Sequence, residues 1–242
     1  MKDLIRVFLG YDPAEAITWH VFNHSIQRRS SQPITVTPVS LSQLKDVHNR
    51  PWHEKQSNEF SFSRWLVPYL CGYEGWAIFA DCDMLCQGDI AELWDMRDER
   101  YAVQVVKHNH VPHGTSKYLD RPQTPYEKKN WSSVMLINCR MCKALTPKYV
   151  ENATGLELHQ FKWLNGDALI GEIPREWNHL VGYDAPNPEA KILHYTEGGP
   201  YFQAYKDTEY AQEWIAELCD AMHCEGASEM LKDVYETMRA QA

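Results

Sequence analysis

Residues 76 to 84 read Trp-Ala-Ile-Phe-Ala-Asp-Cys-Asp-Met, so a run of apolar residues leads directly into two carboxylates set two apart. A continuous apolar run of this length is typical of a strand that is buried on both faces. Asp81 and Asp83 follow it, at the position where open α/β sheets bind ligands. Because residues i and i+2 of an extended segment point to the same side, both carboxylates can reach one divalent cation. An acidic turn is the alternative, since Asp is common at strand ends.

The N-terminal part of the chain predicts the first unit of an α/β fold. Residues 5 to 9 are strand-like, and Asp12 followed by Pro13 is a favourable helix start, because Asp12 can cap the helix and proline fits its first turn. We expect a helix over about residues 14 to 28 and a second strand over residues 34 to 39. A strand, a glycine-containing turn and a helix are typical of a nucleotide-binding unit, although the G-x-G-x-x-G fingerprint of dinucleotide binding is absent.

Residues 57 to 70 carry apolar side chains at helical spacing and come just before the apolar strand. Arg64 lies between these apolar positions. It is either a surface arginine whose stem covers apolar area, or a cation that faces a phosphate.

The middle of the chain predicts a short capped helix over residues 88 to 94, a strand over residues 101 to 107, and then a long irregular segment. Residues 108 to 130 show little periodicity, and a loop of this length is usually functional or disordered. It is a candidate lid or acceptor-binding surface. Three histidines fall within residues 108 to 113, but their spacing is irregular, so we expect a mobile polar loop rather than a zinc site.

The second half predicts a buried strand over residues 134 to 138, a helix over residues 146 to 152 and a last short strand over residues 191 to 193. Two amphipathic helices close the chain. We find no internal repeat or linker, so we expect one domain over residues 1 to 242, with the C-terminal helices of about residues 208 to 239 packed on it.

Composition excludes several classes of protein. A formal net charge of −9 without a basic run argues against nucleic acid as a partner. We find no secretory apolar core and no apolar run near the roughly 18 residues that span a bilayer. Seven cysteines without a signal peptide predict reduced thiols in the cytoplasm. We expect the C-x-x-C pair Cys139 and Cys142 to be buried thiols rather than metal ligands.

A second strand end carries the other candidate ligands. The last strand runs into His194, and Gly198 and Gly199 follow it closely. One neutral imidazole with the carboxylates of Asp81 and Asp83 suits Mn²⁺ (or Mg²⁺) better than Ca²⁺, which takes oxygen ligands. A lone histidine at a strand end is often structural. The glycine pair, whose backbone N–H groups can approach a phosphate, favours a site in which a metal and amide dipoles neutralise a diphosphate.

At this point the chain resembles a known family. Residues 79 to 83, Phe-Ala-Asp-Cys-Asp, resemble the DxD motif of nucleotide-sugar glycosyltransferases with the GT-A fold. The order of the pieces is most similar to glycosyltransferase family 8, the glycogenin-like and galactosyltransferase-like enzymes, over roughly residues 4 to 205. The other matching stretches are residues 60–68, 130–138, 165–167, 174–178 and 192–195.

The resemblance implies an α/β, Rossmann-like GT-A fold with a mixed central sheet flanked by helices. It also implies transfer of a hexose from a nucleotide-diphosphate donor, most simply a UDP-sugar, to a hydroxyl of a saccharide or another acceptor, with retention at the anomeric carbon. The resemblance implies that Asp81, Asp83 and His194 bind the metal, that Asp81 also contacts the ribose, and that Tyr11 and Asp12 contact uracil and ribose. It implies phosphate contacts from Arg64, Gly198 and Gly199. Ser132, Ser133 and Asp167 are the implied contacts of the sugar, and Asp167 is the candidate catalytic carboxylate.

The chain departs from the family pattern in three places. Members usually have a lysine that reaches the diphosphate after the histidine, whereas residues 198 to 201 read Gly-Gly-Pro-Tyr. The phosphate contacts therefore rest on Arg64 and backbone amides, or on a lysine elsewhere in the chain. Ala168 stands where the family often has a glutamine near the reacting sugar, and Ser133 where a glycine is usual. These changes leave the donor sugar open.

Two other functions remain alternatives. A sugar-1-phosphate nucleotidyltransferase can share this fold, but it should show a glycine-rich loop after the first strand, and residues 9 to 13 do not have one. The other alternative is a non-catalytic protein that binds nucleotide sugars or carbohydrate on the same fold, since a fold does not guarantee an activity.

Overall fold

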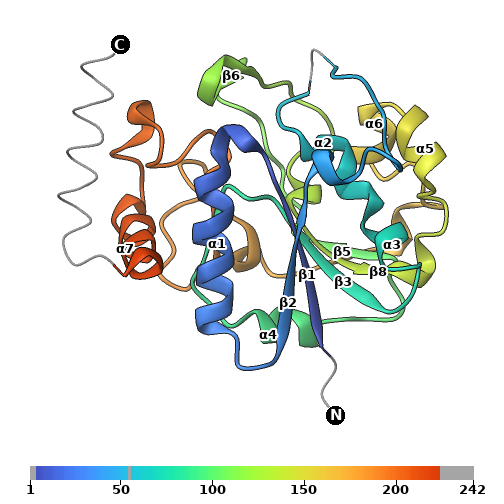
Figure 1. Cartoon of the computed structure of the whole chain (residues 1–242), viewed down its shortest axis with the longest axis horizontal. Coiled ribbons are helices and arrows are strands. Elements are labelled where there is room, and N and C mark those ends of the chain that lie inside the picture. The colour runs from blue at the N-terminus through green and yellow to red at the C-terminus, as the bar shows by residue number, and fades with distance from the viewer. Residues whose placement is uncertain (1–3, 54–55, 224–242) are drawn as a thin grey trace.

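Six strands form the central sheet of the structure, a computed structural model that describes residues 4–53 and 56–223 (Figure 1). They are β1 (Ile5–Gly10), β2 (Ile34–Val39), β3 (Trp76–Ala80), β5 (Val103–Val105), β8 (Val134–Asn138) and β9 (Ile170–Glu172). Their order is β2-β1-β3-β8-β5-β9. β8 is antiparallel to its neighbours β3 and β5, and the other pairs are parallel. The predicted α/β fold with a mixed central sheet is confirmed.

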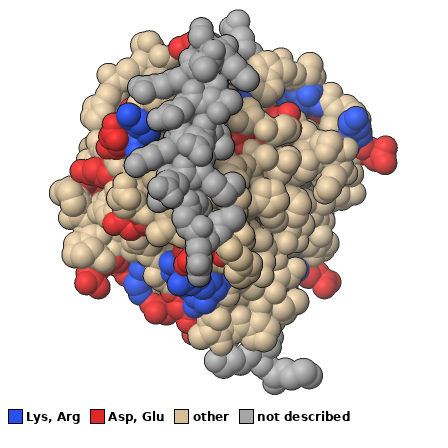
Figure 2. Space-filling model, turned by 60° about the vertical axis from the view of Figure 1, so that its left-hand side comes forward, with Lys and Arg blue, Asp and Glu red and all other residues tan. Residues whose placement is uncertain are grey.

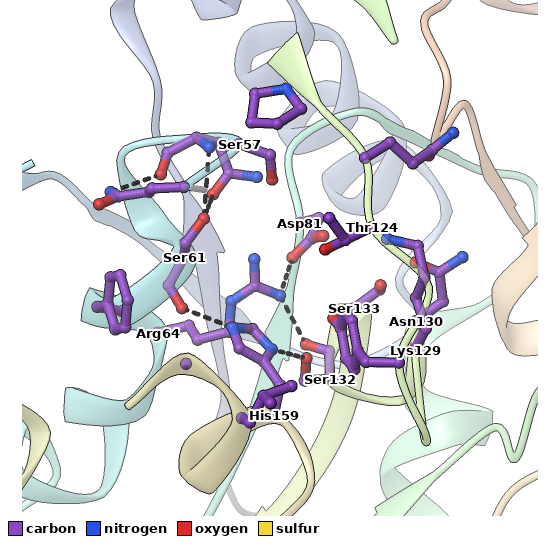
Figure 3. Close-up of a pocket in the computed structure, with 18 of the residues that line it drawn as sticks. Ser57, Ser61, Arg64, Asp81, Thr124, Lys129, Asn130, Ser132, Ser133 and His159 are labelled. Atoms are coloured by element: carbon purple, nitrogen blue, oxygen red, sulfur yellow. Dashed lines mark hydrogen bonds and ion pairs between the residues drawn. The ribbon is translucent and has the colours of Figure 1, made fainter. Parts of the chain in front are cut away.

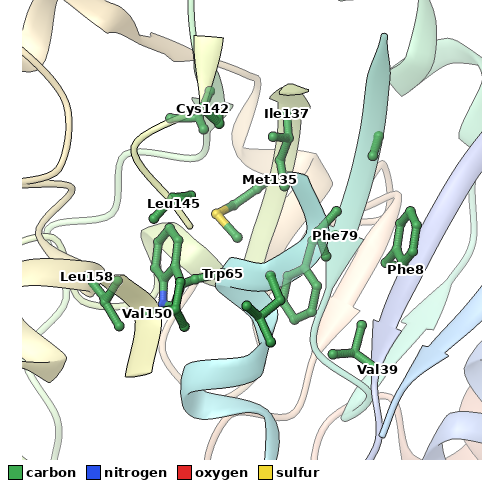
Figure 4. Close-up of a cluster of buried hydrophobic side chains, with 14 of the residues drawn as sticks. Phe8, Val39, Trp65, Phe79, Met135, Ile137, Cys142, Leu145, Val150 and Leu158 are labelled. Carbon is green, nitrogen blue, oxygen red and sulfur yellow. The ribbon is translucent and has the colours of Figure 1, made fainter. Parts of the chain in front are cut away.

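β3 lies inside this sheet, and all of its residues are buried. Its side chains alternate between the two faces, so Phe79 belongs to the apolar cluster of Figure 4 and Ile78 to the cluster on the opposite face. Helix α1 (Ala16–Arg29) packs against the cluster around Ile78, whereas α2 (Phe60–Ser63) and α3 (Val67–Leu70) contribute to the cluster around Phe79. Helices on both faces explain why the strand is apolar throughout.

The helix predicted over residues 57 to 70 is present but interrupted. A single 3-10 turn, Arg64–Leu66, separates α2 from α3. Pro68 lies at the start of α3 and has no N–H to donate to the carbonyl of Arg64, so regular α-helical bonding stops there. The interruption leaves Arg64 buried, with 4% of its surface exposed, so it is not the surface arginine that was one of its two interpretations.

A second, three-stranded sheet has the order β10-β11-β4 and is built from β4 (Met84–Cys86), β10 (His179–Leu180) and β11 (Ile192–His194). β11 is antiparallel to β4, in a register that places His194 opposite Met84. Since β4 follows β3 directly, this pairing brings the end of β11 to the end of β3.

Short helices begin where the sequence predicts them. The side chain of Asp12 accepts a hydrogen bond from the N–H of Ala14, that of Asp89 caps α4 (Ile90–Asp95) and that of Thr146 caps α5 (Pro147–Asn152). The strand predicted over residues 101 to 107 is shorter than expected, and helix α6 (Gly155–His159) was not predicted.

Helix α7 (Ala211–Met222) packs against α1 through a buried carboxylate. Glu217 is 2% exposed, and it accepts a hydrogen bond from His24 and pairs with Arg29 at 2.7 Å. The second predicted C-terminal helix, residues 228 to 238, lies outside the described residues.

The segment of residues 108 to 130 is more ordered than expected. It contains a two-stranded ribbon of β6 (Ser116–Lys117) and β7 (Arg121–Pro122). His108, which was expected in a mobile polar loop, is buried, and the indole N–H of Trp131 donates to its carbonyl at 2.8 Å. This bond to the backbone of His108 helps to anchor the start of the segment.

The cysteines behave as the sequence indicates. Cys82, Cys86, Cys139 and Cys142 are buried free thiols. Burial raises the pKa of Cys86 and of Cys142 to about 12, so both stay protonated and unreactive at neutral pH.

The surface gives two further observations. None of the helices in the described part of the chain is long and apolar enough to cross a membrane. On the face that Figure 2 shows, Lys and Arg side chains lie beside Asp and Glu side chains rather than in one large basic patch.

The buried strand β3 sets the stability of the fold. We expect Ile78→Ala to lower the free energy of unfolding by about 2–5 kcal/mol, because Ile78 is fully buried and its loss leaves a cavity. The matched control is Ile17→Ala on α1, where Ile17 is 40% exposed and the change costs about 0.5 kcal/mol or less. Urea denaturation measures both. Equal losses would contradict the assignment of β3 to the core.

Candidate functional site

Asp81, Asp83 and His194 converge at the carboxyl end of β3. One carboxylate oxygen or ring nitrogen from each lies within 4.8 Å of the others, and all three residues are buried. The N–H of Asp81 donates to the carbonyl of Ser133 at 2.9 Å, and the N–H of Tyr195 donates to the carbonyl of Asp83 at 2.9 Å. Backbone pairing with both neighbouring segments therefore fixes the cluster.

Asn178 orients the imidazole of His194. Nδ2 of Asn178 donates to the carbonyl of Asn130 at 3.1 Å, so its Oδ1 faces Nδ1 of His194 at 2.9 Å, and Nδ1 donates. Nε2 is left with its lone pair, 3.4 Å from Oδ1 of Asp83. That oxygen is buried and has no hydrogen-bond partner in the described part of the chain. Two buried acceptors that face each other are unfavourable, and a divalent cation between carboxylates and imidazole would satisfy both.

The two carboxylates differ in their electrostatics. Burial raises the pKa of Asp81 to about 6, against the opposing charge of Arg64. Burial raises the pKa of Asp83 as well, but the positive charge around it, which includes the ammonium of Lys117, holds that pKa below its usual value. Both are mainly ionised at neutral pH, which is the form that binds a metal.

Arg64 links Asp81 of this cluster to Ser132, which contacts His159 (Figure 3). Its Nη1 donates to Oδ1 of Asp81 at 2.6 Å and to the carbonyl of Ser132 at 2.9 Å. His159 Nε2 lies 3.0 Å from the carbonyl of Ser61 and must donate to it, so its Nδ1 accepts from the hydroxyl of Ser132 at 2.8 Å. Burial and the charge of Arg64 lower the pKa of His159 to about 3, so this imidazole is neutral.

A cavity of about 330 Å³ opens beside these residues. Its walls come from the end of β3, from α2 and the residues before it, from α6, and from the segment of residues 117–133. The lining includes Arg50, Gln56, Ser57, Asn58, Ser61, Phe62, Lys117, Pro122, Gln123, Thr124, Tyr126, Lys129, Asn130, Thr154, Gly155, Leu156, His159 and Thr196.

The structure brings about half of the predicted site residues to this cavity. Arg64, Asp81, Ser132, Ser133 and His194 line it. Asp83 joins them through the cluster with Asp81 and His194.

The other predicted residues lie outside the lining. The carboxylate of Asp12 caps the 3-10 turn Pro13–Glu15 that precedes α1, accepts from the N–H of Glu59 and pairs with Arg121 at 2.6 Å. Half-buried Tyr11 packs edge-on against Trp19.

Asp167 and the glycine pair are also outside it. Asp167 has a side chain that is 70% exposed and pairs with Lys128 at 2.6 Å. The N–H of Gly198 donates to the carbonyl of Tyr195. A Cβ at Gly199 would lie 2.4 Å from the ring of Tyr201, so close packing also accounts for this glycine.

Sequence reasoning missed four residues that shape the site. Lys117 and Lys129 line the cavity, and His159 and Asn178 hold Ser132 and His194. The length of the 108–130 segment was the signal available for the two lysines. His159 gave none. Asn178 lies in a stretch that resembles family 8, but its contact with His194 was not visible because the two residues are 16 apart in the sequence.

Glu15 forms a second buried carboxylate centre near Asp83. Burial, with a contribution from the charge of Asp83, raises the pKa of Glu15 to about 8, so the carboxyl is protonated at neutral pH. Its Oε1 accepts a hydrogen bond from the hydroxyl of Tyr118 at 2.5 Å. This bond ties the residues after β6 to the first turn of the chain.

Comparison with known proteins gives one close relative and several structures of the same fold. No protein-family model matches the chain. Over 226 residues it is 45% identical to Protein CDI of Arabidopsis thaliana, covering 90% of this chain and 87% of that protein.

The similar solved structures are glycosyltransferases. GlyE of Streptococcus pneumoniae has a TM-score of 0.59 at 16% identity, over 98% of this chain and 64% of that chain. The bifunctional glycosyltransferase WbbM has a TM-score of 0.58 at 16% identity, over 90% of this chain and 50% of that chain. LgtC has a TM-score of 0.57 at 11% identity, over 90% of this chain and 96% of that chain. The chain thus spans about half of WbbM and two thirds of GlyE, and the likeness confirms the predicted GT-A type fold.

The hydrogen bond from His194 to Asn178 is expected to control metal affinity. We predict that Asn178→Ala weakens Mn²⁺ binding about 10- to 100-fold, because the imidazole loses the partner that fixes its orientation. Calorimetric titration of Mn²⁺ measures this without a substrate. Asn152→Ala, at an exposed position of α5, is the matched control. Unchanged Mn²⁺ affinity in a folded Asn178→Ala protein would contradict the role of His194.

The raised pKa of Glu15 predicts that the free energy of unfolding depends on pH. The folded carboxyl keeps its proton up to a pKa of about 8, whereas the unfolded one releases it near 4.5, so its contribution is full below about pH 4.5 and is lost as the pH rises to 8. Glu15→Gln removes this loss and should gain stability relative to the unaltered protein between pH 5 and pH 9. Urea denaturation with EDTA at both pH values measures it. If the stability difference between Glu15→Gln and the unaltered protein is the same at pH 5 and at pH 9, the raised pKa of Glu15 is refuted.

Proposed function

This chain belongs to the family of Protein CDI from Arabidopsis thaliana, and we propose that it is a metal-dependent glycosyltransferase. The proposed reaction moves a hexose from a UDP-sugar to a hydroxyl group of a saccharide or another acceptor, with retention at the anomeric carbon. One observation carries the proposal: Asp81, Asp83 and His194 meet beside a cavity, at the carboxyl end of a central strand of a GT-A type fold. The similarity of the sequence order to glycosyltransferase family 8 supports the donor class and the stereochemistry.

Asp81, Asp83 and Nε2 of His194 are the residues that would hold the metal, Mn²⁺ or Mg²⁺. When bound, the metal supplies a Lewis acid that neutralises charge on the leaving diphosphate. Asn178 keeps the proton of His194 on Nδ1, so Nε2 stays available as a ligand. Burial of all three side chains excludes water from the cluster and strengthens its interaction with a cation.

Arg64 has two roles in this proposal. Its bond to Asp81 favours the ionised form of that carboxyl, which is the form that binds the metal. Its Nη2 makes no hydrogen bond within the described residues, and it can donate to a phosphate or sugar oxygen in the cavity.

Ser132 and Ser133 are proposed to contact the donor sugar. Because the hydroxyl of Ser132 donates to neutral His159, its oxygen remains free to accept a hydrogen bond from a sugar hydroxyl. The roles of Tyr11 and Asp12 toward uracil and ribose, and of Asp167 toward the reacting sugar, rest on the resemblance to family 8. Asp167 has to leave its ion pair with Lys128 to act there.

UDP binding tests the proposed function. We expect calorimetric titration to show UDP binding that requires Mn²⁺ and is lost in Asp83→Ala, because this change removes one proposed metal ligand, whose Oδ1 has no hydrogen-bond partner in the described residues. Asp207→Ala removes a carboxylate that is 87% exposed and serves as the matched control.

Two outcomes would overturn the proposal. UDP binding that needs no metal and is unchanged in Asp83→Ala would remove the metal site from the function. A folded protein that binds no UDP would remove the donor class. After a positive result, hydrolysis of UDP-glucose and UDP-galactose would identify the sugar.

A further inference from the structure

Two ammonium groups from one segment line the cavity. Lys117 lies in β6, Lys129 lies twelve residues farther along, and both belong to the lining that includes Asp81 and His194. Figure 3 shows Lys129 beside Asn130 and Thr124, on the wall across from Arg64. The cavity therefore has carboxylates and imidazole at one end and two lysines along one side.

These lysines differ from the other cations of the same segment. Arg121 pairs with Asp12, and Lys128 pairs with Asp167. For Lys117 and Lys129, no carboxylate of the described residues lies within ion-pair distance. Nζ of Lys117 donates to the carbonyl of Thr196 at 3.3 Å, and Nζ of Lys129 lies 5.1 Å from the centre of the Tyr126 ring. Both ammonium groups thus keep donors for a ligand.

The two charges also act on each other. Burial, with a contribution from the positive charge of Lys117, lowers the pKa of Lys129 to about 8. Two partly buried cations in one cavity repel each other, and an anion between them would relieve this repulsion. The whole chain carries a net charge of −9, so a cavity wall with two lysines is opposite in sign to the protein as a whole.

The backbone holds Lys117 in place before any ligand binds. Next to it, the N–H of Tyr118 donates to the carbonyl of Glu197 at 2.9 Å, and the hydroxyl of Tyr118 donates to Glu15. Arg121 reaches Asp12 and the carbonyl of Ser57, both at 2.6 Å. A cation fixed in this way loses little conformational freedom when it binds an anion.

We infer that Lys117 and Lys129 form an anion site for a diphosphate, on the side of the cavity that faces the Asp81, Asp83 and His194 cluster. As a site for the donor's diphosphate, the inference rests on the proposed function. It also accounts for a departure in the sequence, because residues 198 to 201 offer no lysine and the cations come instead from the 108–130 segment. The ligand class is a pyrophosphate or a nucleoside diphosphate.

The test is calorimetric titration of inorganic pyrophosphate into the full chain with EDTA present. We expect binding by the unaltered protein, weakened about 10- to 100-fold by Lys117→Gln or by Lys129→Gln, since each removes a charge-assisted hydrogen bond. Lys143→Gln, at an exposed position outside the cavity, is the matched control. Lys129→Arg keeps the charge and should retain binding, which separates loss of charge from loss of packing.

The outcomes separate this site from the proposed function. The anion site would be overturned if the unaltered protein did not bind pyrophosphate, or if both Gln variants bound it as tightly as the unaltered protein does. Binding of pyrophosphate that needs both lysines, in a protein without Mn²⁺-dependent UDP binding, would keep the anion site and reject the transferase. Mn²⁺-dependent UDP binding that is unchanged in the double Gln variant would reject the lysines and keep the transferase.

Discussion

The pairing of β4 with β11 is the contact on which the rest of the site depends. Each strand has three residues, so the pairing needs support from packing. Leu85 and Leu193 supply it by burying their side chains in a cluster with Val21 of α1 and Trp214 of α7. A slip of one residue would turn His194 away from the carboxylates. The geometry of the cluster of Asp81, Asp83 and His194 therefore depends on how α1 and α7 pack, although neither helix supplies one of these three side chains.

The site concentrates buried charge, and each charge has its own compensation. Arg64 faces Asp81 and Arg121 faces Asp12, whereas Glu15 keeps its proton and accepts a hydrogen bond from Tyr118. Buried ion pairs of this kind add little net stability, because desolvation offsets their attraction. The apolar clusters on both faces of β3 must therefore carry the stability of the fold. Because the apolar clusters supply the stability, the site can hold buried charged groups whose desolvation would be too costly in a structure with a smaller core.

Local sequence predicted the elements whose causes are local. The apolar run of β3, the capping side chain of Asp12, the helix start at Pro147 and the acidic pair after β3 are all visible within a few residues. His194 was found because it ends a strand and because the order of motifs matched a family. The interruption at Pro68 was missed as a helix break, although its cause, the absent N–H, is also local. The partners of His194 and Ser132 were missed because they come from segments that meet only in the folded chain.

The 108–130 segment shows why composition alone did not predict its role. Its prolines and its low periodicity indicated a loop, yet Tyr118, Arg121 and Gln123 tie it to Glu15, Asp12 and Glu197. These bonds make one wall of the cavity part of the framework. A wall that is already in place does not have to be ordered when a ligand binds, so affinity for an anion depends on the charges that the wall presents. In an acidic protein, two lysines without carboxylate partners on such a wall select for negative ligands at this one place.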